Sequence, residues 1–263
     1  MNKTFFWLMV LATLLLPKNV RAYRFTSDFN NGFYFQSFPV GMQIFVDSDS
    51  RGQLLAQLVS QAVSQWENVI GKNIWDIPNS YVVGGHFGNN IRWASNFAAE
   101  TGFDPGSTLA VTTRRTSGTY IGQVEVVLNA EFPGMTSNSG QILYRTILHE
   151  LGHVIMLDHS EVSQVVMASS LTSATSPRSD DVLGANAVVD EALYRQSIGF
   201  TSELAPSGDK SSSPVACGSV DFSGSGGDGG GPFNSVFNLL LGFMVIAFIR
   251  KTSARQKFPD EIA

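Results

Sequence analysis

The chain has 263 residues, which is enough for one domain of ordinary size with additional segments at its ends. Hydrophobic residues make up 43% of it and can form a normal core, while the formal net charge of −5 gives no reason to expect nucleic acid as a partner. The single cysteine, Cys217, excludes an intrachain disulfide and a cysteine-rich zinc module.

Residues 1–22 are typical of a secretory signal peptide. Lys3 supplies a positive charge, residues 5–16 form an apolar core, and a cleavage site ends at Ala22. The alternative is a short membrane anchor, but an apolar core of about twelve residues is too short to span a bilayer comfortably. We therefore predict that the protein is exported.

Strand and helix patterns alternate in the first part of the following domain. The alternation of apolar and polar residues over 42–47 predicts a strand. Apolar residues then recur at helical spacing over 54–70, which predicts an amphipathic helix packed on a sheet and ended by Gly71. Three further strands are expected, over 90–94, 108–114 and 120–130.

Three of the four histidines lie in the stretch HELGHVIMLDHS, which begins at His149. On a helix, His149 and His153 share a face and can reach one metal ion together. Glu150, between them, can reach a metal-bound water rather than the metal. His159 requires the helix to end and the chain to turn back. Three protein ligands leave the fourth tetrahedral position for water, which is the layout of a catalytic zinc site.

Two other interpretations of the polar residues were weighed. A bare pair of histidines around a glutamate can arise by chance on a solvated helix, but a third histidine at this spacing favours zinc. Calcium stays open as a second ion: Asp47, Asp49 and Asp104 are available oxygen ligands, although no spacing among them forms a dedicated calcium loop.

Beyond the histidines, the pattern predicts a loop, a last helix and a linker. Ser179-Asp180-Asp181 is the acidic start expected of a helix that runs to about Tyr194 or Ser197. Residues 203–232 are rich in Ser, Gly, Pro and Asp, a composition typical of a flexible linker that cannot bury a core. The catalytic domain is therefore placed at 23–202.

Residues 233–249 are nearly all apolar, and the tail at 250–263 is basic. A helix over 233–249 would span about 25 Å, which is short but usable for a transmembrane or sorting helix with basic flanks. The positive-inside tendency places the tail in the cytoplasm and the catalytic domain outside. A buried core helix is the alternative. We predict a membrane-anchored or cell-surface protein with an extracytoplasmic domain.

The histidine stretch resembles the zinc signature of the metzincin metalloproteases. The serine directly after the third histidine resembles the matrixin branch, the matrix-metalloproteinase-like enzymes. A methionine farther along occupies the place of the family's Met-turn, beneath the zinc. The resemblance covers roughly residues 35–197. Its matching positions are His149, Glu150, Gly152, His153, Leu157, His159, Ser160 and Met167.

This resemblance implies an α+β metzincin fold with a twisted, mixed, five-stranded sheet, two long helices and a small C-terminal subdomain beneath the zinc. It also implies that an extended peptide binds against an antiparallel edge strand, which we expect within residues 120–130. Met167 is expected to support the zinc ligands from below.

Three departures from the family pattern bear on the site. Met156 stands where the family has glycine, and a positive φ there would cost about 1 kcal/mol. Met167 is followed by Ala168-Ser169 rather than Tyr-Pro, so the wall of the specificity pocket is expected to differ. Cys217 lies downstream of the motif, so latency through a cysteine-switch propeptide is not expected.

The C-terminal segment resembles bacterial tripartite sorting segments of the GlyGly type, with a glycine motif, a hydrophobic helix and a basic end. This resemblance implies cleavage near the glycines by an intramembrane sorting protease and delivery to the cell surface. Retention as a single-pass anchor is the alternative. Cys217 could then hold a lipid or another linkage, or be an incidental linker thiol.

The sequence thus predicts a zinc-dependent endopeptidase that hydrolyses peptide bonds of extracytoplasmic proteins. A zinc-activated water attacks the peptide carbonyl, and Glu150 takes the water's proton and passes it to the leaving amine. Two alternatives remain open: a non-catalytic zinc-containing surface module that binds proteins, and a zinc hydrolase of a non-peptide ester or amide. A Glu150→Ala comparison separates the first, and substrate tests separate the second.

Overall fold

The computed structural model describes residues 23–48, 51–137, 140–199 and 215–221. All of them belong to the first of two units into which the chain divides, 1–223 and 224–263. The predicted signal peptide at 1–22, the apolar helix and sorting segment at 233–249 and the basic tail lie outside the described residues. Within the described residues, no helix combines the length and apolarity needed to cross a membrane.

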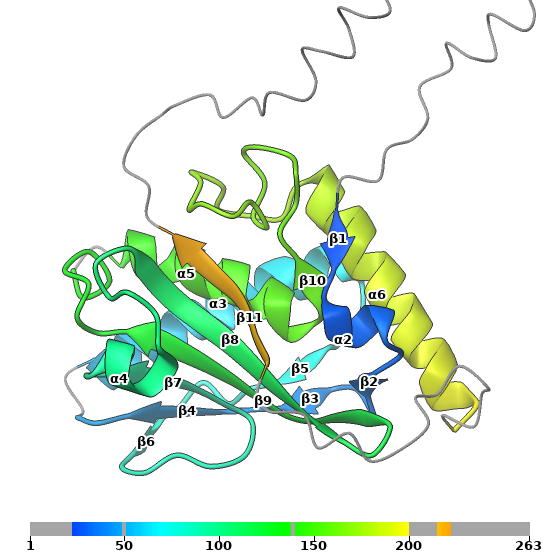
Figure 1. Cartoon of the computed structure of the whole chain (residues 1–263), viewed down its shortest axis with the longest axis horizontal. Helices are drawn as coiled ribbons and strands as arrows, with labels where there is room; N and C mark the ends of the chain where they lie inside the picture. Colours follow the sequence, from blue (N-terminus) through cyan, green and yellow to red (C-terminus); the bar gives the residue numbers. More distant parts are fainter. Residues whose placement is uncertain (1–22, 49–50, 138–139, 200–214, 222–263) are drawn as a thin grey trace, which may run out of the picture. The chain divides into compact units, whose positions relative to one another are not determined.

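Seven strands of the described residues form one mixed sheet (Figure 1). They are β2 (Tyr34–Phe35), β4 (Gln43–Val46), β6 (Val82–Val83), β7 (Asn90–Ala94), β8 (Thr108–Ser117), β9 (Tyr120–Asn129) and β11 (Val215–Asp221). The order is β11-β8-β9-β7-β4-β6, and β2 pairs with β9 beside this path. Within this sheet, as far as the structure describes it, only the pairs β8–β9 and β11–β8 are antiparallel.

The α+β class is confirmed, and the four strands predicted by alternation are present as β4, β7, β8 and β9. The expected five-strand sheet corresponds to β6, β4, β7, β9 and β8, which β2 and β11 extend.

The expected substrate edge is corrected. Residues 120–130 contain β9, which lies inside the sheet between β8 and β7, so the antiparallel outer strand of this five-strand set is β8. The reason is visible in β9 itself: Val126 and Val127 are both buried, as in a strand covered on both faces, and this is why its alternation is blurred.

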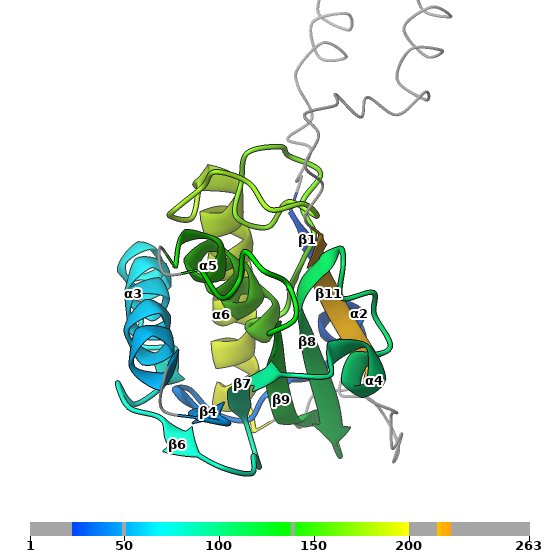
Figure 2. The ribbon, with the colours of Figure 1, turned by 90° about the vertical axis from the view of Figure 1, so that its left-hand side faces the viewer.

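Three long helices pack around the sheet: α3 (Gly52–Ile70), α5 (Gln141–Val154) and α6 (Ser179–Ser197). α3 and α5 lie side by side on one face (Figure 2), where their apolar residues form the main core with the sheet. The Nε1 of Trp66 on α3 donates a buried hydrogen bond of 2.8 Å to the carbonyl of Leu148 on α5. Gly71 ends α3 in the left-handed region at φ 71°, as predicted.

Shorter elements complete the domain. Helix α4 (Phe97–Thr101) packs on the opposite face of the sheet with Val111 and Val127. Helix α2 (Ser27–Asn30) follows β1 (Arg24–Phe25), which pairs with β10 (Leu157–Asp158). A second two-stranded pair joins β3 (Val40–Gly41) to β5 (Trp75–Asp76).

One strand falls in the range assigned to the linker. Val215–Asp221 pairs with β8 as β11, although its composition gives no core-forming pattern. Strand pairing uses backbone hydrogen bonds, which every non-proline residue can supply. Composition therefore does not reveal such a strand.

Candidate metal centre

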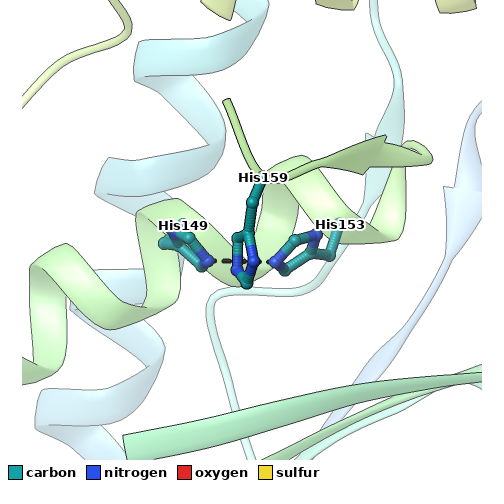
Figure 3. Close-up of side chains that lie close together, drawn as sticks. All are labelled: His149, His153 and His159. Atoms are coloured by element: carbon teal, nitrogen blue, oxygen red, sulfur yellow. Dashed lines mark hydrogen bonds between the residues drawn. The ribbon is translucent and has the colours of Figure 1, made fainter. Parts of the chain in front are cut away.

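Helix α5 supplies two of the three predicted ligands. His149 and His153 lie one helical turn apart on its inner face, and both are buried. Their Nε2 atoms are 2.9 Å apart. Figure 3 shows the ring of His159 entering between them from the chain that follows the helix. Ligand nitrogens of the three imidazoles all lie within 4.8 Å of one another.

The hydrogen bonds of the two helix histidines determine their tautomers. The Nδ1 of His149 lies 2.7 Å from the carbonyl oxygen of Val166, and the Nδ1 of His153 lies 2.7 Å from that of Leu157. A carbonyl oxygen only accepts, so each Nδ1 must carry the proton. Each Nε2 then directs a lone pair toward the other. Two lone pairs at this distance repel, and a shared cation would turn that repulsion into attraction.

Burial keeps these two rings neutral. It lowers the pKa of His149 to about 3, with a further contribution from His159. It also lowers the pKa of His153 well below its usual value, and the two neighbouring histidines add to the effect. A neutral imidazole is the form that binds a metal ion, so these protonation states suit a metal site.

A tight turn brings His159 back over the helix. Met156 adopts a left-handed φ of 76°, as the glycine of the family pattern would, and its N–H donates to the carbonyl of His153 at 2.9 Å. The Met156 carbonyl accepts from the N–H of Thr26 at 3.0 Å, and β1 pairs with β10 just before His159. The N-terminal segment therefore holds this turn in place.

The loop that contains Val166 and Met167 supports the metal centre. Ser160 donates its N–H to the Met167 carbonyl at 2.7 Å, which ties the segment after His159 to this loop. Asp181, on α6, accepts hydrogen bonds from the N–H groups of Val166 and Met167 at 2.9 and 3.0 Å. It also accepts from the Arg178 N–H, which caps α6. One buried carboxylate thus fixes the loop and the start of the last helix.

Met167 packs directly on α5, the helix that contains His149 and His153. A Cβ added at Gly152 would lie 2.2 Å from the Met167 sulfur, closer than any real contact. Gly152 is therefore the residue that lets the methionine approach the backbone of α5, between the two helix histidines.

Glu150 lies on α5 and is fully buried. Its Oε2 accepts a hydrogen bond of 2.6 Å from the hydroxyl of Thr112 on β8, while its Oε1 has no partner among the described residues. Burial raises the pKa of Glu150 to about 8, whereas the Thr112 hydrogen bond and the charge of Arg114 act in the opposite direction. A nearby cation would also favour the carboxylate.

Arg114, two residues along β8, ties three parts of the domain together. Its Nε donates to Asp28 of α2 at 2.9 Å, and its Nη1 donates to the carbonyl of His153 at 2.6 Å. The guanidinium is buried and lies at the carboxyl end of α5, where the helix dipole favours a positive charge.

A family comparison decides the identity of this domain. A family model described as Matrixin matches residues 45–189, more than half of the chain. The chain belongs to the matrixin family. Curated proteins give no match to the chain.

As a matrixin, the chain belongs to a family of zinc metalloproteases, and its three histidines fit a zinc site. The chemistry of the donors agrees, because three imidazole nitrogens are a ligand set that zinc prefers. Among the described residues, neither Asp47 nor Asp104 belongs to a comparable cluster of metal-binding side chains.

Sequence reasoning did not find the supporting residues of this matrixin site. Thr112, Arg114 and Asp28 are far from the motif in the chain, and for Asp181 the sequence predicts only a helix start. The alternation of β8 places Thr112 and Arg114 on one face, but it does not indicate which residues that face meets.

Proposed function

We propose that this matrixin is a zinc-dependent endopeptidase that hydrolyses peptide bonds of extracytoplasmic proteins. The main support is the convergence of three imidazole donors within 4.8 Å, beside a buried Glu150 with one carboxylate oxygen that has no partner among the described residues. Three protein ligands with an adjacent base are the arrangement that a hydrolytic zinc site requires.

Several residues of the chain have separate roles in the proposed reaction. A bound zinc ion would polarise the peptide carbonyl and lower the pKa of a water molecule to about 7. Thr112 holds Oε2 of Glu150, which leaves Oε1 to take a proton from that water. Protonated Glu150 then donates the proton to the leaving amine. Met167 and Asp181 keep the histidine rings in place while the substrate binds.

The substrate edge follows from the sheet. A peptide that adds to β8 in the antiparallel direction passes Thr112, whose side chain contacts Glu150. This is the strand beside which a scissile bond would come closest to the base.

The proposal includes the cellular location. Residues 1–22 direct export, and residues 233–249 with the basic tail keep the protein at the membrane or hand it to a sorting protease. The support for both is the amino-acid pattern of these segments.

The test measures zinc content and cleavage of a mixed peptide library by the full chain, its Glu150→Gln variant and the chelated protein. We expect one zinc per chain in both proteins and cleavage only by the wild-type protein with zinc. General acid–base groups contribute about 10²- to 10⁴-fold, so turnover by the variant should fall by at least 100-fold.

The same experiment addresses the two alternatives. One zinc per chain with no peptide cleavage by the wild-type protein, even at saturating peptide, would contradict the protease. Ester or amide hydrolysis in that case would indicate a non-peptide hydrolase, and its absence would indicate a protein-binding module.

A further inference from the structure

The outer edge of β8 is already paired with a segment of the same chain. β11 runs antiparallel to β8, with Val215 opposite Arg114 and Ala216 opposite Thr113. Figure 2 shows β11 beside β8 at the border of the sheet. The antiparallel direction is the one proposed above for a peptide substrate. Because paired strands lie about 4.8 Å apart, β11 occupies the space that such a peptide would need.

The register places this segment at the level of the proposed base. Ser219 lies opposite Val111, two residues beyond the Ala216–Thr113 pair on β8 but three residues farther along β11. Cys217 and Gly218 therefore both lie opposite Thr112, as a bulge. β11 also lies close to α5, the helix that contributes Glu150. The segment thus passes the part of the cleft where chemistry is proposed.

The burial of the site agrees with a covered cleft. His149 is 1% exposed, and Glu150 and His153 are fully buried. The base and two ligands are therefore shielded in this state.

We infer that residues Val215–Asp221 are an autoinhibitory strand that occupies the peptide-binding edge of β8 and must leave before a substrate can bind. The inference rests on the proposed function for its consequence, while the strand pairing stands independently. It gives the region between the domain and the membrane segment a regulatory role.

The covalent connection makes this inhibition effective. A covalently attached segment competes as an intramolecular ligand, with an effective concentration of about 1 mM at its site. A substrate at about 1 μM with the same affinity would then lose the competition by roughly 1000-fold. Even a weak strand therefore suppresses cleavage, and any event that pulls or cuts the segment away activates the enzyme.

The test introduces Val215→Pro together with Ala216→Pro into the full chain. Neighbouring residues of a strand direct their N–H groups to opposite edges, so one of the two faces β8, and proline removes it. The matched control is Leu204→Pro with Ala205→Pro, a neighbouring pair that also adjoins a native proline but lies outside β11. Both pairs are also made with Glu150→Gln, for measurements without turnover.

Two quantities are measured. Hydrogen exchange of those amides at 109–113 whose N–H groups face β11 should accelerate at least tenfold in the β11 variant, with or without Glu150→Gln, and stay unchanged in the control. The kcat/KM for a peptide substrate should rise at least tenfold in the β11 variant, mainly through a lower KM.

The outcomes separate this inference from the proposed function. Equal exchange rates at 109–113 in the wild-type protein and the β11 variant would contradict the pairing of β11 with β8, whatever the cleavage rates. Faster exchange without a gain in cleavage by an active protein would overturn its inhibitory role. Faster exchange with no cleavage by any protein would support the strand and contradict the protease.

Discussion

The two sides of the metal centre are built in different ways. His149 and His153 are placed by one helix, whose periodicity alone brings them to a common face. His159 is placed by a chain of tertiary contacts: the strained turn at Met156, the pairing of β1 with β10, and the loop held by Asp181. A sequence motif can therefore specify half of a site locally, while the other half depends on remote residues.

Removing one ligand from each side is the strongest test of this difference. Both His159→Ala and His153→Ala should weaken zinc binding by more than 100-fold, beyond the effect of losing a supporting hydrogen bond. His153→Ala should also lower the free energy of unfolding of the metal-free protein by about 2 kcal/mol, since it leaves the buried Leu157 carbonyl unpaired. Zinc titration and urea unfolding measure the two effects. If His159→Ala lowers the free energy of unfolding of the metal-free protein more than His153→Ala does, the comparison is contradicted.

Asp181→Asn should loosen only the side of the metal centre that contains His159, which tertiary contacts hold in place. The amide oxygen can still accept a hydrogen bond, but the NH₂ group faces backbone donors. Hydrogen bonds to a buried carboxylate are therefore lost, and the free energy of unfolding should fall by about 3 kcal/mol. Zinc affinity should fall by about 10- to 100-fold. Asp180→Asn is the control, because Asp180 accepts only from the Ser160 hydroxyl in this region and an amide oxygen can replace it. Equal effects of the two substitutions would refute this role of Asp181.

Thr112→Val should reduce turnover without changing the contacts that hold the three zinc ligands. The hydroxyl that holds Oε2 of Glu150 is lost while the side chain keeps its shape, so kcat should fall by about 10-fold. Zinc content and KM should stay as in the wild type. Thr113→Val, the adjacent and less buried position, is expected to retain full kcat. Steady-state kinetics decide the matter, and a Thr112→Val enzyme with normal kcat would count against Glu150 as the base.

The smallest expected effect is the difference in stability, about 1 kcal/mol, between two substitutions at Met156. Met156→Gly relieves a left-handed φ worth about 1 kcal/mol but removes a buried side chain worth about 2–5 kcal/mol, so a net loss of about 2 kcal/mol is expected. Met156→Ala loses the side chain and keeps the strain, and it should be about 1 kcal/mol less stable than the glycine variant. Urea unfolding of both variants measures this. Equal stabilities would mean that the turn is not strained.

Local patterns predicted much of the fold. The long helices at α3 and α6 and the strands β4, β7, β8 and β9 follow from periodicity and from end signals such as Gly71 and Asp180-Asp181. These features depend on neighbours in the chain, so the sequence is sufficient to place them. The clustering of His149, His153 and His159 was predictable for the same reason on the helix, and through the family resemblance beyond it.

Long-range features could not be predicted. Alternation predicts that β8 and β9 are strands but not their order in the sheet, so it does not show that β8 rather than β9 is the outer strand of the five-strand set. The contacts of Thr112 with Glu150 and of Arg114 with Asp28 and the His153 carbonyl join residues far apart in the chain. The composition around β11 does not predict a strand, and its pairing uses the backbone edge of β8.

The most direct test of the account is the zinc X-ray absorption spectrum of the full chain and of its Glu150→Gln variant. Three imidazole nitrogens at about 2.0–2.1 Å, with one further light atom and the same spectrum in the variant, are the result expected for a three-histidine site in which Glu150 is not a ligand. A loss of one nitrogen in the variant, fewer than three imidazoles, or a sulfur at about 2.3 Å would contradict it.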